Sequence, residues 1–525
     1  MKTPGVYIVE KNAFPNSVVE ASTAIPAFIG ITEKACNGAD PLAGKPWKIA
    51  SMSEFQQFFG GAPQPRFVLS VADAPAAKAF FSIPSPDGSK VLSVEDQSGP
   101  FSLYYQMVMF FANGGGTCYI VSVGTYGEGK PVDKEKVAAA LAALKKEQEI
   151  TMVAVPEAAS VVDCKDIQTQ VLAHCGEMMN RFALLDVQPK AEANETMEQQ
   201  IETFRTNVGA NFLSYGAAYY PWLHTSVLSG KDIDGAALTW DFTQAAPDIA
   251  PFFGKDSRFP AYFQAVFEEI RKGAGLSAPA AKGGKEKAAE EASKKEPSLS
   301  GDQLDALKNN LHNAFLQNSK GYQFIVDKVR EKLNFLPPSA AMAGIYTMVD
   351  NTRGVWKAPA NVSVNYVNSP AENIDSAGQE DLNMPMNGKA VNAIRVFPGE
   401  GIKVWGARTL DGNSQDWRYV NVRRTMMFLE ESVKNAAKAY VFEPNVSATW
   451  MNVRAMIDNF LRSVWKRGGL AGSVPEDAYE IHVGLGDTMT PEDILDGIMR
   501  ITVLVAVSRP AEFIEITFQQ QMQKS

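Results

Sequence analysis

The sequence of 525 residues has little cysteine, little histidine and no excess of positive charge. Its four cysteines include no Cys-x-x-Cys pair, so the sequence predicts no disulfide framework. The formal net charge of −9 argues against general nucleic-acid binding, which needs concentrated lysine and arginine. The longest apolar run, at 501–507, is far shorter than the ~20 residues of a membrane helix, so we expect no membrane insertion.

The sequence also contains few residues that indicate a metal site, a reactive thiol or a signal peptide. None of the four histidines has a partner three or four residues away, so no helical metal pair exists. Only the tertiary fold could bring His174 and Cys175 close to Cys164. The first residues contain no apolar stretch long enough for a signal peptide. We therefore expect no catalytic, metal or cofactor site, and synthesis in a reducing cytoplasm.

A regular alternation of elements occupies the first half of the chain. Helix-like segments separate the apolar runs, and the clearest is 133–148, with apolar residues at helical spacing. Strands about 30 residues apart with a helix between them predict βαβ units and a largely parallel sheet. The fold class expected is therefore mixed α/β. The apolar runs lie at 118–123, 150–155, 182–187 and 215–220.

The second half of the chain begins with a charged tract, and regular patterns of apolar residues typical of helices and strands follow it. Residues 276–300 are rich in Lys, Glu, Ala and Gly and cannot bury a core, which indicates a flexible insertion. Helical patterns resume at 302–333 and end at the two prolines 337 and 338. Further strands are expected at 393–397, 401–408, 479–483 and 501–507, with amphipathic helices at 421–441 and 447–466 and a short helix opening at 490–493.

One segment imitates a nucleotide-binding loop. GTYGEGKP, at 124–131, follows a strand, precedes a helix and matches G-x-x-x-x-G-K, and Asp186 ends a later strand. Pro131 replaces the Ser or Thr that would ligate Mg²⁺, and Glu128 adds negative charge to the loop. A glycine-rich connection is the simpler interpretation. A P-loop-like enzyme that uses Lys130 and Asp186 remains the alternative.

The N-terminal segment 4–9 predicts a strand that is apolar on both faces. Val6 and Ile8 point to one face, and Tyr7 and Val9 point to the other. Such a strand needs cover on both sides, and little chain precedes it. We expect it to join a sheet formed elsewhere, and a second strand to follow at 24–32.

In the last segment, 512–519, apolar and polar residues alternate instead. Ile514, Ile516 and Phe518 share one face, and polar residues share the other, which predicts a half-buried strand. Two hypotheses follow from this pattern. The strand could close a sheet of its own domain, or it could complete the sheet of a neighbouring chain. A chain that both donates and accepts strands forms head-to-tail polymers.

The sequence resembles the contractile tail sheath proteins of phages, R-type pyocins, type VI secretion and extracellular contractile injection systems. The combination of VWGARTL, VFEPN and RPAEFI is the most specific part of the likeness. The matching phrases are TPGVYIVE (3–10), STAIPAFIGIT (22–32), FFANGGGTCYIVSV (110–123), RFALLDV (181–187), YGAAYYPWL (215–223), LPPSAAMAGIYTMVDNTRGVWKAPANVSV (336–364), VFPGEGIKVWGARTL (396–410), WRYVNVRRTMMFLEESV (417–433), VFEPNVSATW (441–450) and RPAEFI (509–514).

The resemblance implies a structural subunit, not an enzyme, that assembles around an inner tube and contracts to drive that tube through a target envelope. It implies a core domain built from the N-terminal segment and the C-terminal third, with α/β domains inserted between them. The expected ranges are 1–33 for the N-terminal arm, 34–275 for the inserted domains, 276–300 for the flexible tract, 301–355 for the helical end and 356–525 for the core with its C-terminal arm.

The resemblance also implies partners and contact residues. The subunit is expected to bind copies of itself, an inner tube protein, and baseplate and terminator or cap proteins. Assembly is expected in the bacterial cytoplasm, within a phage-tail-like particle that can be released from the cell; a phage-tail-like or extracellular device is favoured over type VI secretion, whose sheaths resemble two chains. Lys466 and Arg467 are candidates to face the tube. The candidate interlocking residues are Val6, Tyr7, Ile8, Val9, Phe513, Ile514, Ile516 and Phe518.

Overall fold

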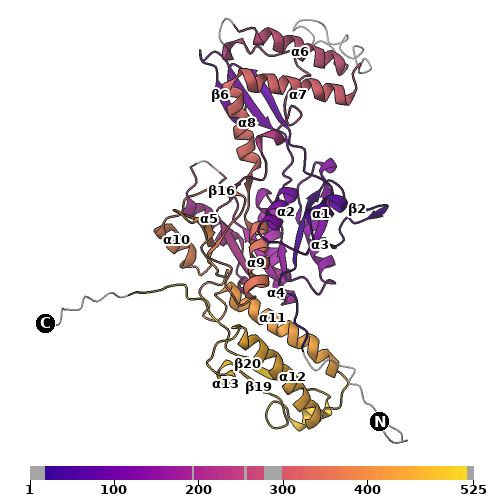
Figure 1. Ribbon diagram of the computed structural model, residues 1–525, viewed down its shortest axis with the longest axis vertical. Coiled ribbons are helices and arrows are strands. Elements are labelled where there is room, and N and C mark those ends of the chain that lie inside the picture. Colours follow the sequence, from indigo (N-terminus) through magenta and orange to yellow (C-terminus); the bar gives the residue numbers. More distant parts are fainter. Residues whose placement is uncertain (1–17, 192–193, 254–256, 277–297, 517–525) are drawn as a thin grey trace, which may run out of the picture.

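A computed structural model describes residues 18–191, 194–253, 257–276 and 298–516. Three lobes lie in a row, here named upper, central and lower (Figure 1). Each lobe has its own hydrophobic cluster. The predicted strand at 4–9, residue Phe518 and most of the predicted flexible tract lie outside the described residues.

The central lobe contains a nine-stranded sheet in the order β15-β18-β17-β11-β10-β9-β1-β8-β4. Strands β11, β10, β9, β1 and β8 run parallel to one another, as the alternating pattern predicts. Every residue of β1 is buried, which explains its unbroken apolar sequence. These strands are β1 (Pro26–Thr32), β8 (Cys118–Thr125), β9 (Met152–Ala154), β10 (Phe182–Asp186) and β11 (Gly216–Tyr220).

Helices cover both faces of this sheet. The chain moves from β1 to β8 in one direction along the sheet, and from β8 through β9 and β10 to β11 in the other. Right-handed crossovers therefore place α2 on one face and α3, α4 and α5 on the opposite face. Helix α9 packs against α2 and so shares its face. The helices are α2 (Leu103–Ala112), α3 (Lys134–Leu144), α4 (Cys164–Met178), α5 (Met197–Asn207) and α9 (Ser339–Arg353).

The C-terminal third extends the same sheet. Strand β17 pairs in parallel with β11, and β18 and β15 follow in antiparallel arrangement. The central core therefore includes strands from both sides of the boundary expected at 355/356. These added strands are β15 (Val362–Ser363), β17 (Asn392–Phe397) and β18 (Gly401–Val404), with β4 (Trp47–Ile49) at the other edge. The remaining central elements are β2 (Cys36–Asn37), β3 (Asp40–Pro41), α1 (Met52–Phe59), β12 (Leu223–Thr225), β14 (Phe335–Leu336), β16 (Val367–Pro370) and α10 (Ser376–Asn383).

The upper lobe combines two distant stretches of chain. A four-stranded sheet packs against three helices around an aromatic cluster that includes Trp240, Phe263 and Phe315. The helical pattern at 302–333 is in fact two helices, because Ser319 ends the first and accepts the Tyr322 N–H at the start of the second. The elements are β5 (Phe67–Ala72), β6 (Ala79–Pro84), β7 (Val91–Asp96), β13 (Leu238–Trp240), α6 (Phe259–Gly273), α7 (Gly301–Asn318) and α8 (Lys320–Leu333).

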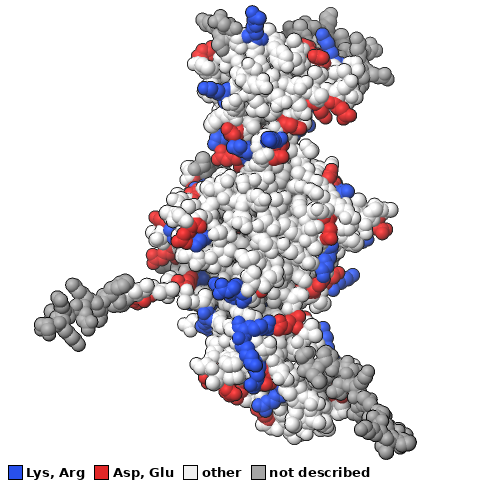
Figure 2. All heavy atoms as spheres, in the orientation of Figure 1, with Lys and Arg blue, Asp and Glu red and all other residues white. Residues whose placement is uncertain are grey.

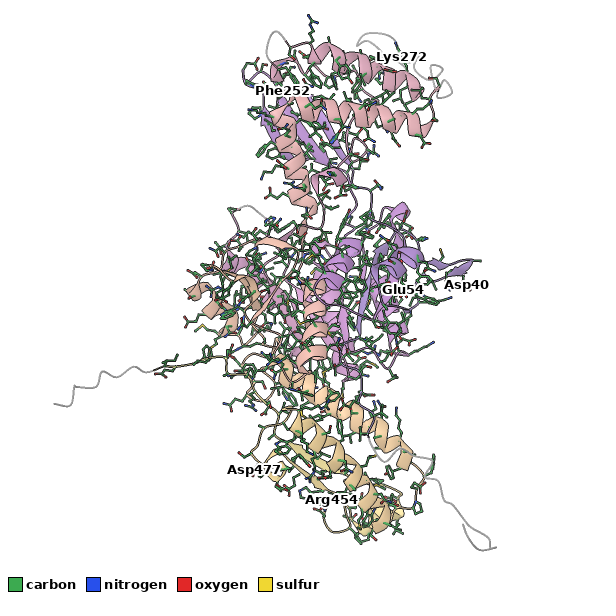
Figure 3. The ribbon with its side chains drawn as sticks, in the orientation of Figure 1. Asp40, Glu54, Phe252, Lys272, Arg454 and Asp477 are labelled. Atoms are coloured by element: carbon green, nitrogen blue, oxygen red, sulfur yellow. The ribbon has the colours of Figure 1, made fainter. Side chains whose placement is uncertain are left out.

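Figure 3 labels side chains in each lobe: Phe252 and Lys272 in the upper, Glu54 and Asp40 in the central, and Arg454 and Asp477 in the lower. Asp40 lies on the hairpin of β2 and β3, which projects from the side of the central lobe.

The lower lobe matches the sequence-based expectation closely. Its two long helices fall within a turn of the predicted ranges, and Val453, Ile457 and Phe460 form the buried stripe of the second. A two-stranded sheet packs on that helix. The elements are α11 (Val420–Ala437), α12 (Ser447–Lys466), α13 (Pro475–Ala478), β19 (Tyr479–His482), α14 (Pro491–Leu495) and β20 (Thr502–Val505).

Candidate assembly surface

The root of the C-terminal segment is fixed by an ion pair between two phrases that are 104 residues apart in the sequence. Arg408 of VWGARTL donates to Glu512 of RPAEFI, with Nη2 to Oε2 at 2.6 Å and Nε to Oε1 at 3.0 Å. Asn383 Nδ2 and the Tyr419 hydroxyl donate to the same carboxylate at 2.8 and 3.1 Å. We call these four residues the arm clamp. They attach the chain to the central lobe immediately before its last described residues.

The clamp is largely shielded from water. The Arg408 side chain is 2% exposed and that of Glu512 is 20% exposed. Burial of the Glu512 carboxyl raises its pKa, but the hydrogen bonds from Arg408 and Asn383 outweigh burial, so the pKa lies below its ordinary value. Arg408 also donates Nη1 to the Asn383 carbonyl oxygen at 3.1 Å. The clamp is therefore a charge-assisted contact that stays ionised at mildly acidic pH.

Beyond the clamp the chain leaves the molecule. Phe513, Ile514 and Ile516 are 71%, 78% and 70% exposed. Residues 511–516 form no strand, so the described part of this segment does not close a sheet of its own chain. Figure 1 shows it running sideways away from the body, between the central and lower lobes. We call residues 513–516 the C-terminal arm.

The lower lobe presents a small open sheet. Strands β19 and β20 pair antiparallel from Tyr479↔Val505 to His482↔Thr502, and neither has a second partner strand among the described residues. Leu504, in the middle of β20, is 52% exposed. A two-stranded sheet is marginal alone and is stabilised here by packing on α12. Its outer edges keep backbone donors and acceptors available to another strand.

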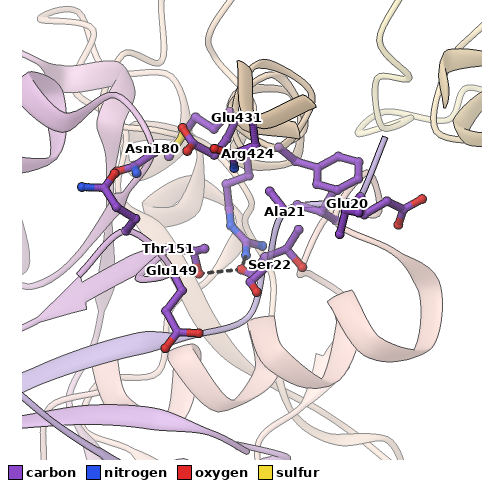
Figure 4. Close-up of a pocket in the computed structure, with 15 residues that line it drawn as sticks. Glu20, Ala21, Ser22, Glu149, Thr151, Asn180, Arg424 and Glu431 are labelled. Carbon is purple, nitrogen blue, oxygen red and sulfur yellow. Dashed lines mark hydrogen bonds between the residues drawn. The ribbon is translucent and has the colours of Figure 1, made fainter. Parts of the chain in front are cut away.

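The N-terminal segment is attached at the junction of the central and lower lobes. Ala21 N–H donates to Ser432 Oγ at 2.9 Å, and the Thr23 carbonyl accepts Arg424 Nη2 at 2.8 Å. Figure 4 shows Arg424 reaching from α11 toward this segment, beside a cavity of about 290 Å³. Arg424 also makes a buried ion pair with Asp350, at 2.6 and 2.9 Å. Burial raises the pKa of Asp350, and the guanidinium opposes that rise.

Basic side chains gather at this same junction (Figure 2). Arg467, one of the two residues expected to face a tube, forms an ion pair with Glu20 and lies over the Trp356 ring at 5.2 Å. Lys466 is exposed. Arg467 thus helps to hold the N-terminal segment, while the tube-facing role of both residues stays a prediction.

The segment that imitates a P-loop is closed on itself. Glu128 accepts the Thr125 N–H at 3.2 Å and pairs with Lys136 at 3.1 Å, so a carboxylate of the loop occupies a donor that a phosphate would need. Lys130 is exposed. Asp186 accepts the Ser339 N–H at 2.8 Å, and its strand β10 lies three strand spacings, about 14 Å, from β8. The structure does not bring Lys130 and Asp186 together.

The usual ligand crevice of a doubly wound sheet is also filled. Strand order reverses between β1 and β9, where such folds bind ligands. Here the Glu157 carboxylate accepts N–H groups of Ile31, Ser102 and Leu103 at 2.8, 2.7 and 3.0 Å. Burial raises the pKa of Glu157 to about 7. A side chain of the protein thus occupies the N-terminus of α2.

Cys164, His174 and Cys175 do not converge, because all three lie on α4 and ten residues of helix, about 15 Å, separate Cys164 from His174. His174 Nε2 lies 3.0 Å from Arg181 Nη1, and burial lowers the pKa of His174 to about 4. Cys164 and Cys175 are buried free thiols. Among the residues described, no group of His, Cys, Asp and Glu has the geometry to hold a metal ion. Within the same residues, no helix is long and apolar enough to cross a membrane.

Both phrases of the clamp are distinctive in the sequence, but nothing in either phrase predicts that Arg408 contacts Glu512. The one hint in the sequence is that Arg408 and Glu512 carry opposite charges and that each lies in a segment rich in apolar residues. Asn383 and Tyr419 carried no signal, because only the tertiary fold brings them to the carboxylate.

Comparison with known proteins supports the resemblance. The model of the phage tail sheath C-terminal domain family matches residues 413–521. The tail sheath protein of Vibrio phage KVP40 is 23% identical over 201 residues, which cover 38% of this chain and 28% of that protein. A putative prophage major tail sheath protein of Pseudomonas aeruginosa (strain UCBPP-PA14) is 25% identical over 138 residues, which cover 26% of this chain and 34% of that protein. The chain thus spans about a third or less of these relatives.

Solved structures match the whole chain. The sheath complex of an extracellular contractile injection system, PVC, in its contracted state has a TM-score of 0.59 and 26% identity, covering 99% of this chain and 98% of that one. The contracted helical sheath of the anti-feeding prophage gives 0.59 and 26%, covering 99% and 100%. The resemblance inferred from the sequence is confirmed, because a family model, curated tail sheath proteins and the solved sheaths of contractile injection systems all match this chain.

Proposed function

We propose that this chain is a sheath subunit that polymerises head to tail by exchanging terminal strands, and that the polymer surrounds an inner tube. The observation that carries the proposal is the C-terminal arm: a buried clamp fixes its root, and three large apolar side chains then extend into solvent. Apolar side chains of this size rarely stand in a row on the surface of a monomer. Their exposure indicates that a partner covers them.

The β19–β20 pair is the acceptor we propose. Its unpaired edges match the backbone of an incoming strand, and its apolar underside already packs on α12. Each new backbone hydrogen bond contributes only about 0.5–1.5 kcal/mol. Several in a row, with burial of Phe513, Ile514 and Ile516, suffice to link two subunits. The Arg408–Glu512 ion pair then transmits force from the C-terminal arm, and so from the neighbouring subunit, to the central lobe.

Contraction is possible in this proposal because the lobes of each subunit stay rigid while the contacts between lobes of neighbouring subunits are exchanged. The three lobes keep separate hydrophobic clusters, whereas the arms connect subunits through short extended segments. Neighbours remain tethered while their lobe-to-lobe contacts change, which is the usual form of a bistable assembly. In this proposal the contracting polymer drives the tube through a target envelope. The further partners are an inner tube protein, and baseplate and terminator or cap proteins, with assembly in the bacterial cytoplasm and release within a particle.

Truncation tests the proposal. Ending the chain before Phe513, or deleting residues 1–12, should leave folded subunits that form no long tubes under negative-stain electron microscopy. Tyr262→Ser is a matched control, because it removes an exposed aromatic side chain from the upper lobe, far from both arms. We expect tubes from this variant. Normal tubes from either truncation would show that the arms do not interlock subunits.

A further inference from the structure

The upper lobe contains a cavity bounded by its sheet, the start of α8 and the segment that precedes α6, where Phe252 lies (Figure 3). We call it the upper-lobe pocket. Its volume is about 320 Å³, within the range of small-molecule sites. The lining residues Leu92 and Ile249 are buried, whereas the lining residues Pro86 and Lys320 are exposed. The pocket therefore extends from the hydrophobic cluster of this lobe to the surface, and its mouth lies between the β6–β7 turn and α8.

The walls of the pocket are largely hydrocarbon. Val71, Ile83 and Leu92 supply aliphatic side chains from the three strands β5, β6 and β7. Tyr322 also lines the pocket, but its hydroxyl is hydrogen-bonded to His312 Nδ1 at 2.8 Å. An apolar ligand would gain dispersion contacts with these side chains, and the Tyr322 hydroxyl would keep its partner.

The aromatic rings of the pocket already pack on one another. The ring centroids of Phe315 and Tyr322 lie 4.8 Å apart in a stacked arrangement, and the Trp240 ring lies 5.5 Å from that of Phe315. A flat aromatic ligand would compete for these faces, whereas a flexible aliphatic chain adapts to the space that the rings leave. Since a cavity of about 150 Å³ holds one benzene ring, this volume holds roughly twelve carbon atoms. One aliphatic chain of that length fills it.

The mouth of the pocket is polar and positively charged. Among the described lining residues, only Lys320 carries a charge. Lys320 and Gly321 begin α8, and the first N–H groups of a helix have no carbonyl partner within that helix. The nearby carboxylates of Asp87 and Asp248 each accept a backbone N–H group of their own turn at 3.0 Å. A lysine beside a helix N-terminus favours an anionic group at the mouth.

We infer that the upper-lobe pocket binds one free aliphatic carboxylate of about ten to twelve carbons. The chain lies among the aliphatic and aromatic walls, and the carboxylate lies at Lys320 and the start of α8. The volume accommodates one chain, so the ligand is a free fatty acid and not a two-chain membrane lipid. The inference is independent of the proposed strand exchange, because the upper lobe contains neither the C-terminal arm nor the β19–β20 pair.

Calorimetric titration of the full chain with dodecanoate, below its micelle-forming concentration, tests the inference. One equivalent per chain should bind saturably. Butanoate should not bind measurably, because its short chain leaves most of the walls without contact. Failure of dodecanoate to bind saturably, or equal affinity for butanoate, would overturn the inference.

Two substitutions at Gly321 show whether the ligand enters the upper-lobe pocket. A Cβ at this position meets only Ser319 Oγ, at 3.7 Å, so Gly321→Phe and Gly321→Ala should both fold, and thermal unfolding without ligand checks this. The phenylalanine side chain should obstruct the mouth and weaken dodecanoate binding by about tenfold or more, whereas alanine should leave it unchanged. Equal affinities of the two variants would place the ligand elsewhere and overturn the inference.

The charge at the mouth has its own test. Lys320→Gln should weaken dodecanoate binding about fivefold and leave the binding of the uncharged dodecanol unchanged, because only the carboxylate contacts the ammonium group. Lys328→Gln is the matched control: Lys328 lies on the same helix but pairs with Glu331 at 2.7 Å and does not line the pocket. Unchanged dodecanoate binding by Lys320→Gln, or an equal loss for dodecanol, would overturn the assignment of a carboxylate.

Discussion

The arm clamp gives the sharpest prediction, because one substitution frees a residue that a protease recognises. Arg408→Leu removes the guanidinium and leaves Glu512 in place, with only Asn383 and Tyr419 as donors. Hydrogen bonds to charged groups contribute about 1.5–3 kcal/mol, so we expect the closed clamp to lose about 2 kcal/mol. This corresponds to a roughly 30-fold rise in the population with a released Glu512.

A glutamate-specific protease reports that population directly. Cleavage after Glu512 requires release of its side chain, whereas Glu515 is exposed and is cut in either case. The ratio of the two products in mass spectrometry should therefore rise about 30-fold in Arg408→Leu, if cleavage follows the open population. Arg395→Gln is a suitable control, because Arg395 bonds Gln379 and not Glu512. An unchanged ratio in Arg408→Leu would refute the clamp.

Three further predictions concern the central sheet. Burial raises the pKa of both Glu157 and Asp186 to about 7, so the folded state holds protons that the unfolded state releases; unfolding free energy should fall as pH rises from about 4 to about 7. Glu157→Gln should flatten that slope in denaturant titrations, and an identical slope would contradict the assignment. Mg-ATP should not saturate the protein in calorimetry, and saturable binding lost in Lys130→Ala would restore the nucleotide-binding alternative. Asn392→Leu should lower stability by about 3 kcal/mol in thermal unfolding, because it leaves the Ala218 carbonyl and Arg408 backbone groups unpaired; a loss under 1 kcal/mol would contradict this.

The elements that could be predicted from the sequence are those with a local signal. Strands β8, β9, β10 and β11 follow from apolar runs at regular spacing, and α12 follows from its apolar stripe. The break at Ser319 was missed, because the apolar spacing of α7 continues into α8 and hides the change of direction. The upper lobe was missed as a unit, since three strands of its sheet come from residues before 100, and the fourth strand and the helices come from residues after 230.

Contacts between distant residues had no such signal. Strand β17 joins β11 across more than 170 residues, so its place in the central sheet depends on the tertiary fold. The same holds for Arg408 and Glu512, each of which is an ordinary charged residue in its own segment.

A cryo-EM map of tubes assembled from the full chain tests the central claim most directly. The account predicts that residues 513–516 of one subunit form a strand along β19 or β20 of a neighbour, with Glu512 still bound to Arg408 of its own subunit. Density in which the arm returns to its own lobes, or tubes in which β19 and β20 remain a two-stranded sheet, would contradict it.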